Sequence, residues 1–179
     1  GAASHAQVDA GTSSVVSLVP SLSKVSILAT QATTSGTEKD FTIPAGARQI
    51  TVKYVGVSTN GMSHYLIQLG DAGGIEDTNY LGSGSALGGA VSTANYTTGF
   101  GLGVGNASEV VHGSVTLDLV DPATFTWVAS GAIGSSAAGA VYPTSGSKVL
   151  SEALTTVRVT MVNGTDAFDA GLVGVSYIL

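Results

Sequence analysis

Charged residues are scarce in this sequence of 179 residues, which has six Lys and Arg and twelve Asp and Glu. A nucleic-acid-binding surface needs a basic stripe, and a net charge of −6 does not supply one, so we expect no nucleic-acid partner. Cysteine is absent, which excludes a disulfide framework and thiolate metal ligands. No run of about 18 or more apolar residues occurs, so no membrane insertion is expected.

The shortage of charge has a consequence for assembly. A folded monomer of this mass exposes roughly 8,000 Å² of surface, and the few charged groups cover that area thinly. Hydrophobic residues make up 44% of the chain, and the mean hydropathy is +0.38. We therefore expect part of the surface to be buried against copies of the same chain. A monomer coated with Ser, Thr and Gly is the alternative.

What the chain has in abundance, from Lys24 onward, is short runs in which apolar and polar residues alternate. In residues 48–57, Ile50, Val52 and Tyr54 share one face of an extended strand. The same alternation occurs in residues 64–70, 114–120, 125–129, 156–162 and 171–179. No segment keeps a helical period beyond two turns. Many short strands at close spacing predict an all-β protein, an antiparallel β-sandwich or jelly roll.

Turn signals separate these runs. Asn60-Gly61 and Asn163-Gly164 predict hairpin turns, because a type I′ turn needs positive φ angles. Residues 70–110 are rich in glycine and predict long loops around one or two strands. Within them, residues 99–105 alternate Gly with apolar side chains, which favours a tightly packed strand over a phosphate-binding loop, since no βαβ unit follows.

Two parts of the chain have residue patterns that occur in other proteins. Residues 4–24, and Gln-Val-Asp-Ala-Gly-Thr at 7–12 above all, resemble a recurring tail-fibre element. Residues 41–61, 68–80, 126–131, 154–171 and the final strand are similar, in the same order, to the C-terminal domain of phage and prophage tail fibres. This resemblance implies a shaft or linker segment at 1–24 and a β-sandwich tip domain at 25–179.

The resemblance also implies a function. A homotrimeric fibre tip in the virion would bind a bacterial surface glycan, such as lipopolysaccharide, or an outer-membrane protein during host adsorption, and would join the rest of the tail fibre. The expected protein is therefore not an enzyme. The alternative is a structural virion protein, such as a capsid decoration, a head fibre or a trimerisation module, that binds no receptor.

Loops are the expected place for a receptor site, because a rigid sandwich presents them at its ends. Aromatic rings stack on sugar faces, and planar amides and carboxylates bond to sugar hydroxyls. The aromatic residues in predicted strands are assigned to the core, and those in predicted loops become the candidates. The receptor-binding residues predicted in this way are Asn79, Tyr80, Asn95, Tyr96 and Tyr142, with Glu76, Asp77 and His64 as weaker companions.

Other chemistry has little support. Asp71, Glu76 and Asp77 lie close in sequence, so we considered a glycosidase pair and a calcium site. A glycine-rich loop shields a carboxyl group poorly from water, and the spacing is not that of a recognised calcium loop. The three histidines are far apart. We predict no catalytic residue, no metal site and no cofactor. A carbohydrate-active enzyme is the third hypothesis, after the receptor-binding fibre tip and the structural virion protein.

Overall fold

The computed structural model describes residues 25–104 and 106–179. These residues form fourteen strands and no helix, so the all-β prediction is confirmed. It follows that the described residues contain no helix long and apolar enough to cross a membrane. The predicted shaft or linker at 1–24 lies outside the described residues.

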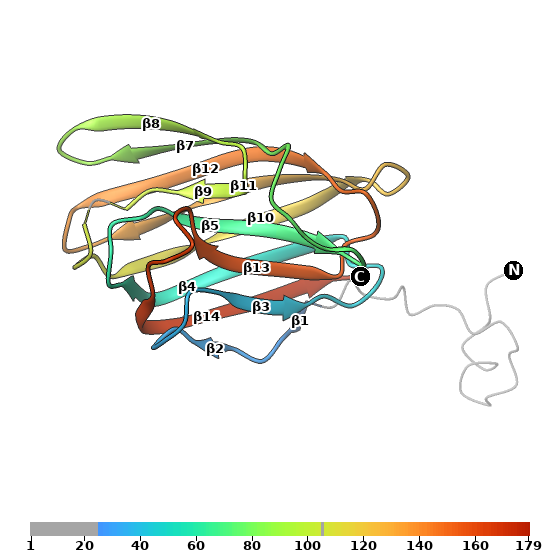
Figure 1. Cartoon of the computed structure of the whole chain (residues 1–179), viewed down its shortest axis with the longest axis horizontal. Helices are drawn as coiled ribbons and strands as arrows, with labels where there is room; N and C mark the ends of the chain where they lie inside the picture. Colours follow the sequence, from blue (N-terminus) through green and yellow to red (C-terminus); the bar gives the residue numbers. More distant parts are fainter. Residues whose placement is uncertain (1–24, 105) are drawn as a thin grey trace, which may run out of the picture.

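The strands form two antiparallel sheets that face each other (Figure 1). The larger sheet contains, in spatial order, β1 (Ser26–Ile27), β14 (Phe168–Ile178), β4 (Gln49–Thr59), β10 (Val111–Asp121), β11 (Thr126–Ser135), β12 (Ala140–Val149), β7 (Leu81–Leu87) and β8 (Val91–Tyr96), and β2 (Gln31–Ala32) also pairs with β14. The smaller sheet contains β3 (Lys39–Thr42), β13 (Thr156–Met161), β5 (Tyr65–Asp71) and β6 (Gly74–Glu76), and β9 (Phe100–Leu102) also pairs with β5. This arrangement agrees with the predicted sandwich, whereas the jelly-roll topology and the trimer stay predictions.

The core lies between the two sheets, and the period of two in the sequence places its residues. Ile50, Val52 and Tyr54 of β4 are buried there, as are Val157 and Val159 of β13. Full burial of such a side chain contributes about 1.5–3 kcal/mol. Trp127 of β11 and Val175 of β14 belong to the same core, so the predicted inward faces are confirmed in both sheets.

Strand β5 departs from the predicted alternation, because all its residues are buried and both of its faces are covered. The segment 97–99 lies over the face predicted to be outward. The side-chain amide of Gln68 donates a hydrogen bond to the Thr98 carbonyl at 2.9 Å, and a Cβ atom on Gly99 would lie 2.6 Å from Leu66 Cγ. This cover comes from a segment thirty positions along the chain, so the local pattern does not reveal it.

The prediction of long loops in residues 70–110 is wrong, since the region contains the four strands β6, β7, β8 and β9. Several of its glycines serve close packing rather than loop freedom. A Cβ atom on Gly101 would lie 2.2 Å from the Tyr96 ring, and one on Gly82 would lie 2.9 Å from the Tyr96 carbonyl oxygen. The strand predicted for the alternating glycine segment is confirmed as β9.

The two Asn-Gly pairs form corners between the sheets instead of the predicted hairpins. Asn60-Gly61 joins β4 to β5, and Asn163-Gly164 joins β13 to β14, so each corner leads from one sheet to the other. The corners also bond to each other. The Ala167 amide donates to Asn60 Oδ1 at 2.8 Å, and the Ser63 amide donates to Asp166 Oδ2 at 2.9 Å. Local turn preference thus located the turns, while tertiary pairing decided what they connect.

Two buried tyrosines offer a matched test of the core. Tyr54 Oη has no hydrogen-bond partner among the described residues, whereas Tyr80 Oη accepts from the Leu69 amide at 2.7 Å and donates to the Glu76 carbonyl at 3.0 Å. Tyr54→Phe is expected to leave the free energy of unfolding unchanged or raise it by up to about 1 kcal/mol, and Tyr80→Phe to lower it by about 1–3 kcal/mol. Urea denaturation measures both, and equal losses would contradict this assignment.

Candidate functional site

The structure buries the three tyrosine rings predicted to bind a receptor, which corrects that prediction. Tyr80 is 1% exposed, Tyr142 is 2% exposed and Tyr96 is 7% exposed. The Tyr80 ring meets Phe100 edge-on, with 5.1 Å between the ring centroids. None of these rings offers a face for a sugar to stack on, and their hydroxyl groups bond within the fold.

The hydroxyl partners explain why these rings point inward. Tyr142 Oη donates to the buried carboxylate of Glu109 at 2.5 Å, and Tyr96 Oη lies 2.6 Å from His64 Nδ1. A Cβ atom on Gly103 would lie 2.8 Å from the Tyr142 ring. The signal that sequence reasoning missed is therefore the glycines of β9 and its flanks, which leave room for the rings.

Glu76 is also engaged inside the fold. Its carboxylate forms an ion pair with Lys148 Nζ and accepts a hydrogen bond from the Ser151 amide at 2.7 Å. Lys148 is 2% exposed, donates to the Thr78 carbonyl at 3.0 Å and lies 5.2 Å from the centre of the Tyr80 ring. Glu76 thus neutralises a buried cation, which is a structural role.

Asp71 belongs to the same buried network. Its carboxylate accepts from the Ser151 hydroxyl at 2.5 Å and from the amides of Glu152 and Gly73 at 3.0 and 2.8 Å. These hydrogen bonds, the Ser151 bond first, lower the pKa of Asp71. Among the described residues, no group of three or more His, Asp and Glu is placed to hold a metal ion.

His64 is half-buried beside Tyr96, and the two rings are tilted with centroids 5.9 Å apart. Burial lowers the pKa of His64, so the imidazole is neutral at pH 7. Its hydrogen bond to Tyr96 makes it part of the support of β8 rather than an exposed contact.

The remaining predicted residues are exposed, but they do not form one site. Asn79 occupies the left-handed region with φ 59° just before Tyr80, Asp77 lies beside the smaller sheet, and Asn95 lies on β8 of the larger sheet. Asp77 and Asn95 line two separate hollows.

The first hollow, which we call the polar groove, lies on the outer side of the smaller sheet and has a volume of about 280 Å³. Strand β5 supplies Leu66 and Gln68, strand β13 supplies Arg158, Thr160 and Met161, and the segments around them supply the rest. Its side chains with hydrogen-bonding groups are Thr37, Glu38, Gln68, Asp77, Thr98, Arg158, Thr160 and Asn163. Of these residues, Asp77 is the one predicted from the sequence as a site residue; the alternation in residues 156–162 places Arg158 on the outward face of β13 but does not single it out.

Arg158 is the fixed centre of the polar groove. Its guanidinium donates two hydrogen bonds to the Asp40 carboxylate, both at 2.7 Å, and forms an ion pair with Glu38 at 2.7 Å. The pair with Asp40 raises the pKa of Arg158. A guanidinium held in this geometry gives the groove a rigid wall.

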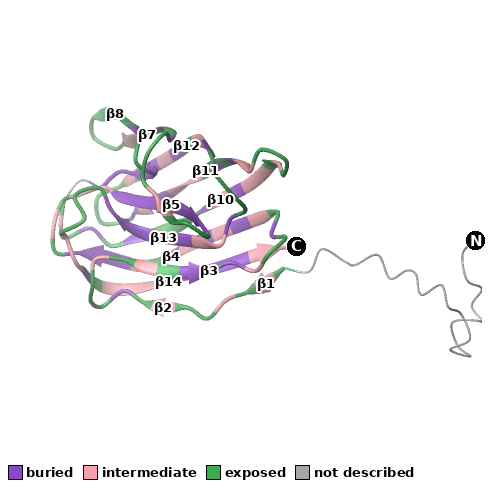
Figure 2. Cartoon of the chain, turned by 45° about the vertical axis from the view of Figure 1, so that its right-hand side comes forward, coloured by how far each residue is buried: buried purple, intermediate pink, exposed green. Residues whose placement is uncertain are grey.

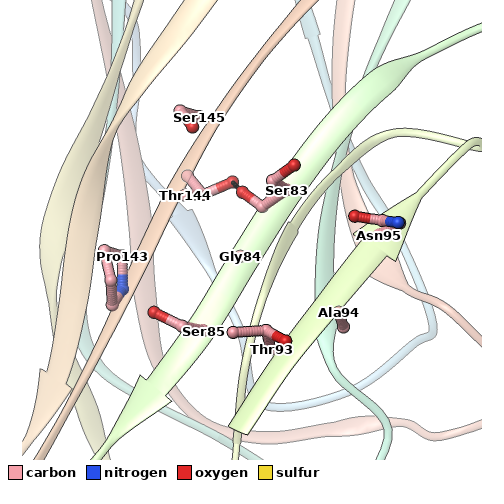
Figure 3. Close-up of a pocket in the computed structure, with 9 residues that line it drawn as sticks. All are labelled: Ser83, Gly84, Ser85, Thr93, Ala94, Asn95, Pro143, Thr144 and Ser145. Atoms are coloured by element: carbon pink, nitrogen blue, oxygen red, sulfur yellow. Dashed lines mark hydrogen bonds between the residues drawn. The ribbon is translucent and has the colours of Figure 1, made fainter.

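The second hollow, about 510 Å³, opens on the outer face of β12, β7 and β8 (Figure 3). Apart from Ala94 and Pro143, its side chains carry hydroxyl groups or an amide, and no side chain in its lining is charged. The side chains that face it are Ser83, Ser85, Thr93, Asn95, Pro143 and Ser145.

Comparisons with protein families, with curated proteins and with solved structures found no match to this chain. The resemblance of individual segments to tail fibres therefore stays a prediction, and the site rests on its own geometry.

The buried ion pair predicts a strong effect at Glu76. Glu76→Gln leaves the Lys148 ammonium buried without its counter-ion, which is expected to lower the free energy of unfolding by about 3 kcal/mol. The double variant Glu76→Gln/Lys148→Met removes both charges and is expected to lose less than the single variant. Urea denaturation measures the free energy of unfolding of the wild type, the single variant and the double variant. If Glu76→Gln were as stable as the wild type, the ion pair between Glu76 and Lys148 would contribute nothing to stability.

His64 predicts a dependence of stability on pH. Burial lowers its pKa in the folded state, so the unfolded chain, with a pKa of about 6.5, takes up the proton first. The stability due to neutral His64 is present above that value and is lost as the pH falls towards the folded pKa. Between about pH 7.5 and pH 5.5, the free energy of unfolding should fall more steeply in the wild type than in His64→Asn. Equal slopes would contradict the assignment.

Proposed function

We propose that this chain is the distal domain of a phage or phage-like tail fibre, and that it binds a bacterial surface glycan through the polar groove without chemical turnover. The polar groove carries the proposal. It brings the exposed carboxylate of Asp77 onto one sheet face beside the Gln68 amide, the Asn163 amide and the Arg158 guanidinium, which are held in place by hydrogen bonds within the fold. Carboxylate and amide groups form directional hydrogen bonds with sugar hydroxyls.

The chemistry of the groove favours a glycan over an outer-membrane protein. Its lining is polar and its volume suits one or two sugar rings rather than an apolar side-chain cluster. Without an aromatic ring in the lining, binding rests on hydrogen bonds, so the affinity of one site is modest. A trimer on a fibre, with several fibres in a virion, supplies avidity without further contacts.

The carboxylates of the groove support binding rather than hydrolysis. A glycosidase acid needs a carboxyl group shielded from water, so that its pKa rises. Glu38 and Asp77 are both exposed, and Glu38 is ion-paired with Arg158. Asp71 and Glu76, the other candidates, are occupied by partners inside the fold.

A structural virion protein is the second candidate. The uncharged hollow of Figure 3 favours it, because an uncharged surface suits contact between protein subunits. Loss of a decoration protein weakens the shell while adsorption persists, whereas loss of a fibre tip abolishes adsorption.

A pair of isosteric variants tests the adhesion proposal. Asp77→Asn lies in the polar groove, and the control Glu152→Gln removes one exposed negative charge outside its lining. Asp77→Asn should reduce binding by about tenfold or more, because it loses a charged hydrogen bond worth about 1.5–3 kcal/mol. Glu152→Gln should bind like the wild type.

The measurement is the adsorption of labelled protein to intact cells and purified lipopolysaccharide from a panel of bacteria. Adsorption to protease-treated cells separates a glycan receptor from an outer-membrane protein. If the wild type adheres to no member of the panel, or if both variants bind equally, the polar groove is not a receptor site.

A further inference from the structure

Two long segments of the chain carry no Asp, Glu, Lys, Arg or His, namely residues 78–108 and 122–147. They contain β7, β8, β9 and β11 and most of β12. Lys148, near the end of β12, points inward and is buried. The outer face of the larger sheet over β11, β12, β7 and β8 therefore has no charged side chain, and we call it the neutral face.

The neutral face is apolar at both ends and hydroxylated between them. Six of the fourteen large apolar side chains that are exposed in the described residues lie on it. They are Leu81, Leu87, Val91, Val128, Val141 and Val149. Leu81 and Val91 are 75% and 71% exposed, which is unusual for a surface that stays in water. Between them, a row of paired residues crosses the sheet from Ser130 through Ser145 and Ser83 to Asn95.

Strand β8 adds an open edge to this face. Among the described strands, β8 pairs only with β7 and ends the larger sheet, and Figure 2 shows it at the margin of the molecule, with much of the hairpin exposed. Natural sheets protect such an edge with charge, proline or short length. The residues of β8, Val91–Tyr96, have neither charge nor proline.

The other edges do have such protection. On the far side of the larger sheet, β1 and β2 are two residues long each. In the smaller sheet, β3 carries Lys39 and Asp40, and β6 and β9 are three residues long. Among the sheet edges formed by residues 25–104 and 106–179, β8 is thus the one with the length and the chemistry to pair with another chain.

The net charge of the chain favours a second copy of the same chain as the partner that covers the neutral face. The chain has a net charge of −6, so two copies repel each other wherever their acidic surfaces meet. The neutral face is the surface on which a copy can meet a copy without that cost. Its small Ser, Ala and Gly side chains also allow two sheets to approach to about 10 Å.

The size of the face is sufficient. Strands β11, β12, β7 and β8 are 10, 10, 7 and 6 residues long. At about 3.3 Å a residue and about 4.8 Å between strands, they present roughly 500 Å². With the same area from the partner, the contact reaches about 1,000 Å², the size that a well-packed specific interface needs.

We infer that copies of this chain pack against one another through the neutral face and the edge of β8. The hollow of Figure 3 then receives side chains of the neighbouring copy instead of a sugar. The neutral face is then the surface through which the copies of the proposed trimer meet. This contact is independent of receptor binding, because the polar groove lies on the other sheet.

Light scattering of the full chain tests the inference with a matched pair of variants. Val141 lies on the neutral face and is 47% exposed, and Val162 lies outside it and is 48% exposed. The wild type and Val162→Lys are expected at a multiple of 17.7 kDa, about threefold for a trimer. Val141→Lys is expected at 17.7 kDa, because it places a charge inside an uncharged contact.

Thr93→Lys, on the edge of β8, is a second disrupting variant, and circular dichroism confirms that each variant keeps its strands. Since the contact contains no ion pair, the mass of the wild type should not fall when salt is raised from about 0.1 M to about 1 M. A monomeric wild type, or Val141→Lys and Thr93→Lys with the mass of the wild type, would overturn the inference. A monomeric Val141→Lys that still binds lipopolysaccharide weakly would leave the adhesion proposal intact, whereas an oligomer that binds nothing would remove only that proposal.

Discussion

The close contact between glycine backbone and tyrosine rings determines which groups this domain shows to water. Because Gly101 and Gly103 lack a Cβ atom, the rings of Tyr96 and Tyr142 fit directly against β9 and its flank. The rings then occupy the interior, and their hydroxyls bond to His64 and Glu109. With the large rings turned inward, β7, β8 and β12 present serines, threonines and short apolar side chains on the outside. Any side chain at Gly101 would push the Tyr96 ring out of place and alter that outer surface.

The two outer faces consequently differ in chemistry. The smaller sheet carries Arg158 with its acidic partners and the amides of the polar groove, while the outward-facing side chains of the strands at the end of the larger sheet carry no charge. One face is thus suited to a hydrated, hydroxyl-bearing ligand, and the other to a dry contact with a copy. Since the faces lie on opposite sheets (Figure 1), assembly and adhesion do not compete for the same surface.

The fold class could be predicted from the sequence because alternation with period two is a local property, as Ile50, Val52 and Tyr54 show. The candidate site could not. The sequence predicts Tyr80 to be a loop residue. In the structure its hydroxyl accepts a hydrogen bond from the Leu69 amide of β5, and its ring packs edge-on against Phe100. Only the tertiary fold creates these contacts. Asn60-Gly61 has the local signature of a hairpin turn. The contact that stabilises it as a corner between the sheets joins the Ser63 amide to Asp166, more than a hundred residues away, and local preference does not reveal it. Asp77 was found, but Arg158 and Gln68 were not, because they reach the groove from strands distant in sequence.

Hydrogen–deuterium exchange of the full chain, with and without lipopolysaccharide, tests the separation of the two faces most directly. The account predicts slow exchange of the β8 amides, Val91–Tyr96, without any ligand, because a neighbouring copy covers that edge. It also predicts that the ligand protects residues 97–99 and 162–164 around the polar groove. Fast exchange along β8 in the unliganded protein, together with ligand protection on β8 rather than at the groove, would contradict the account.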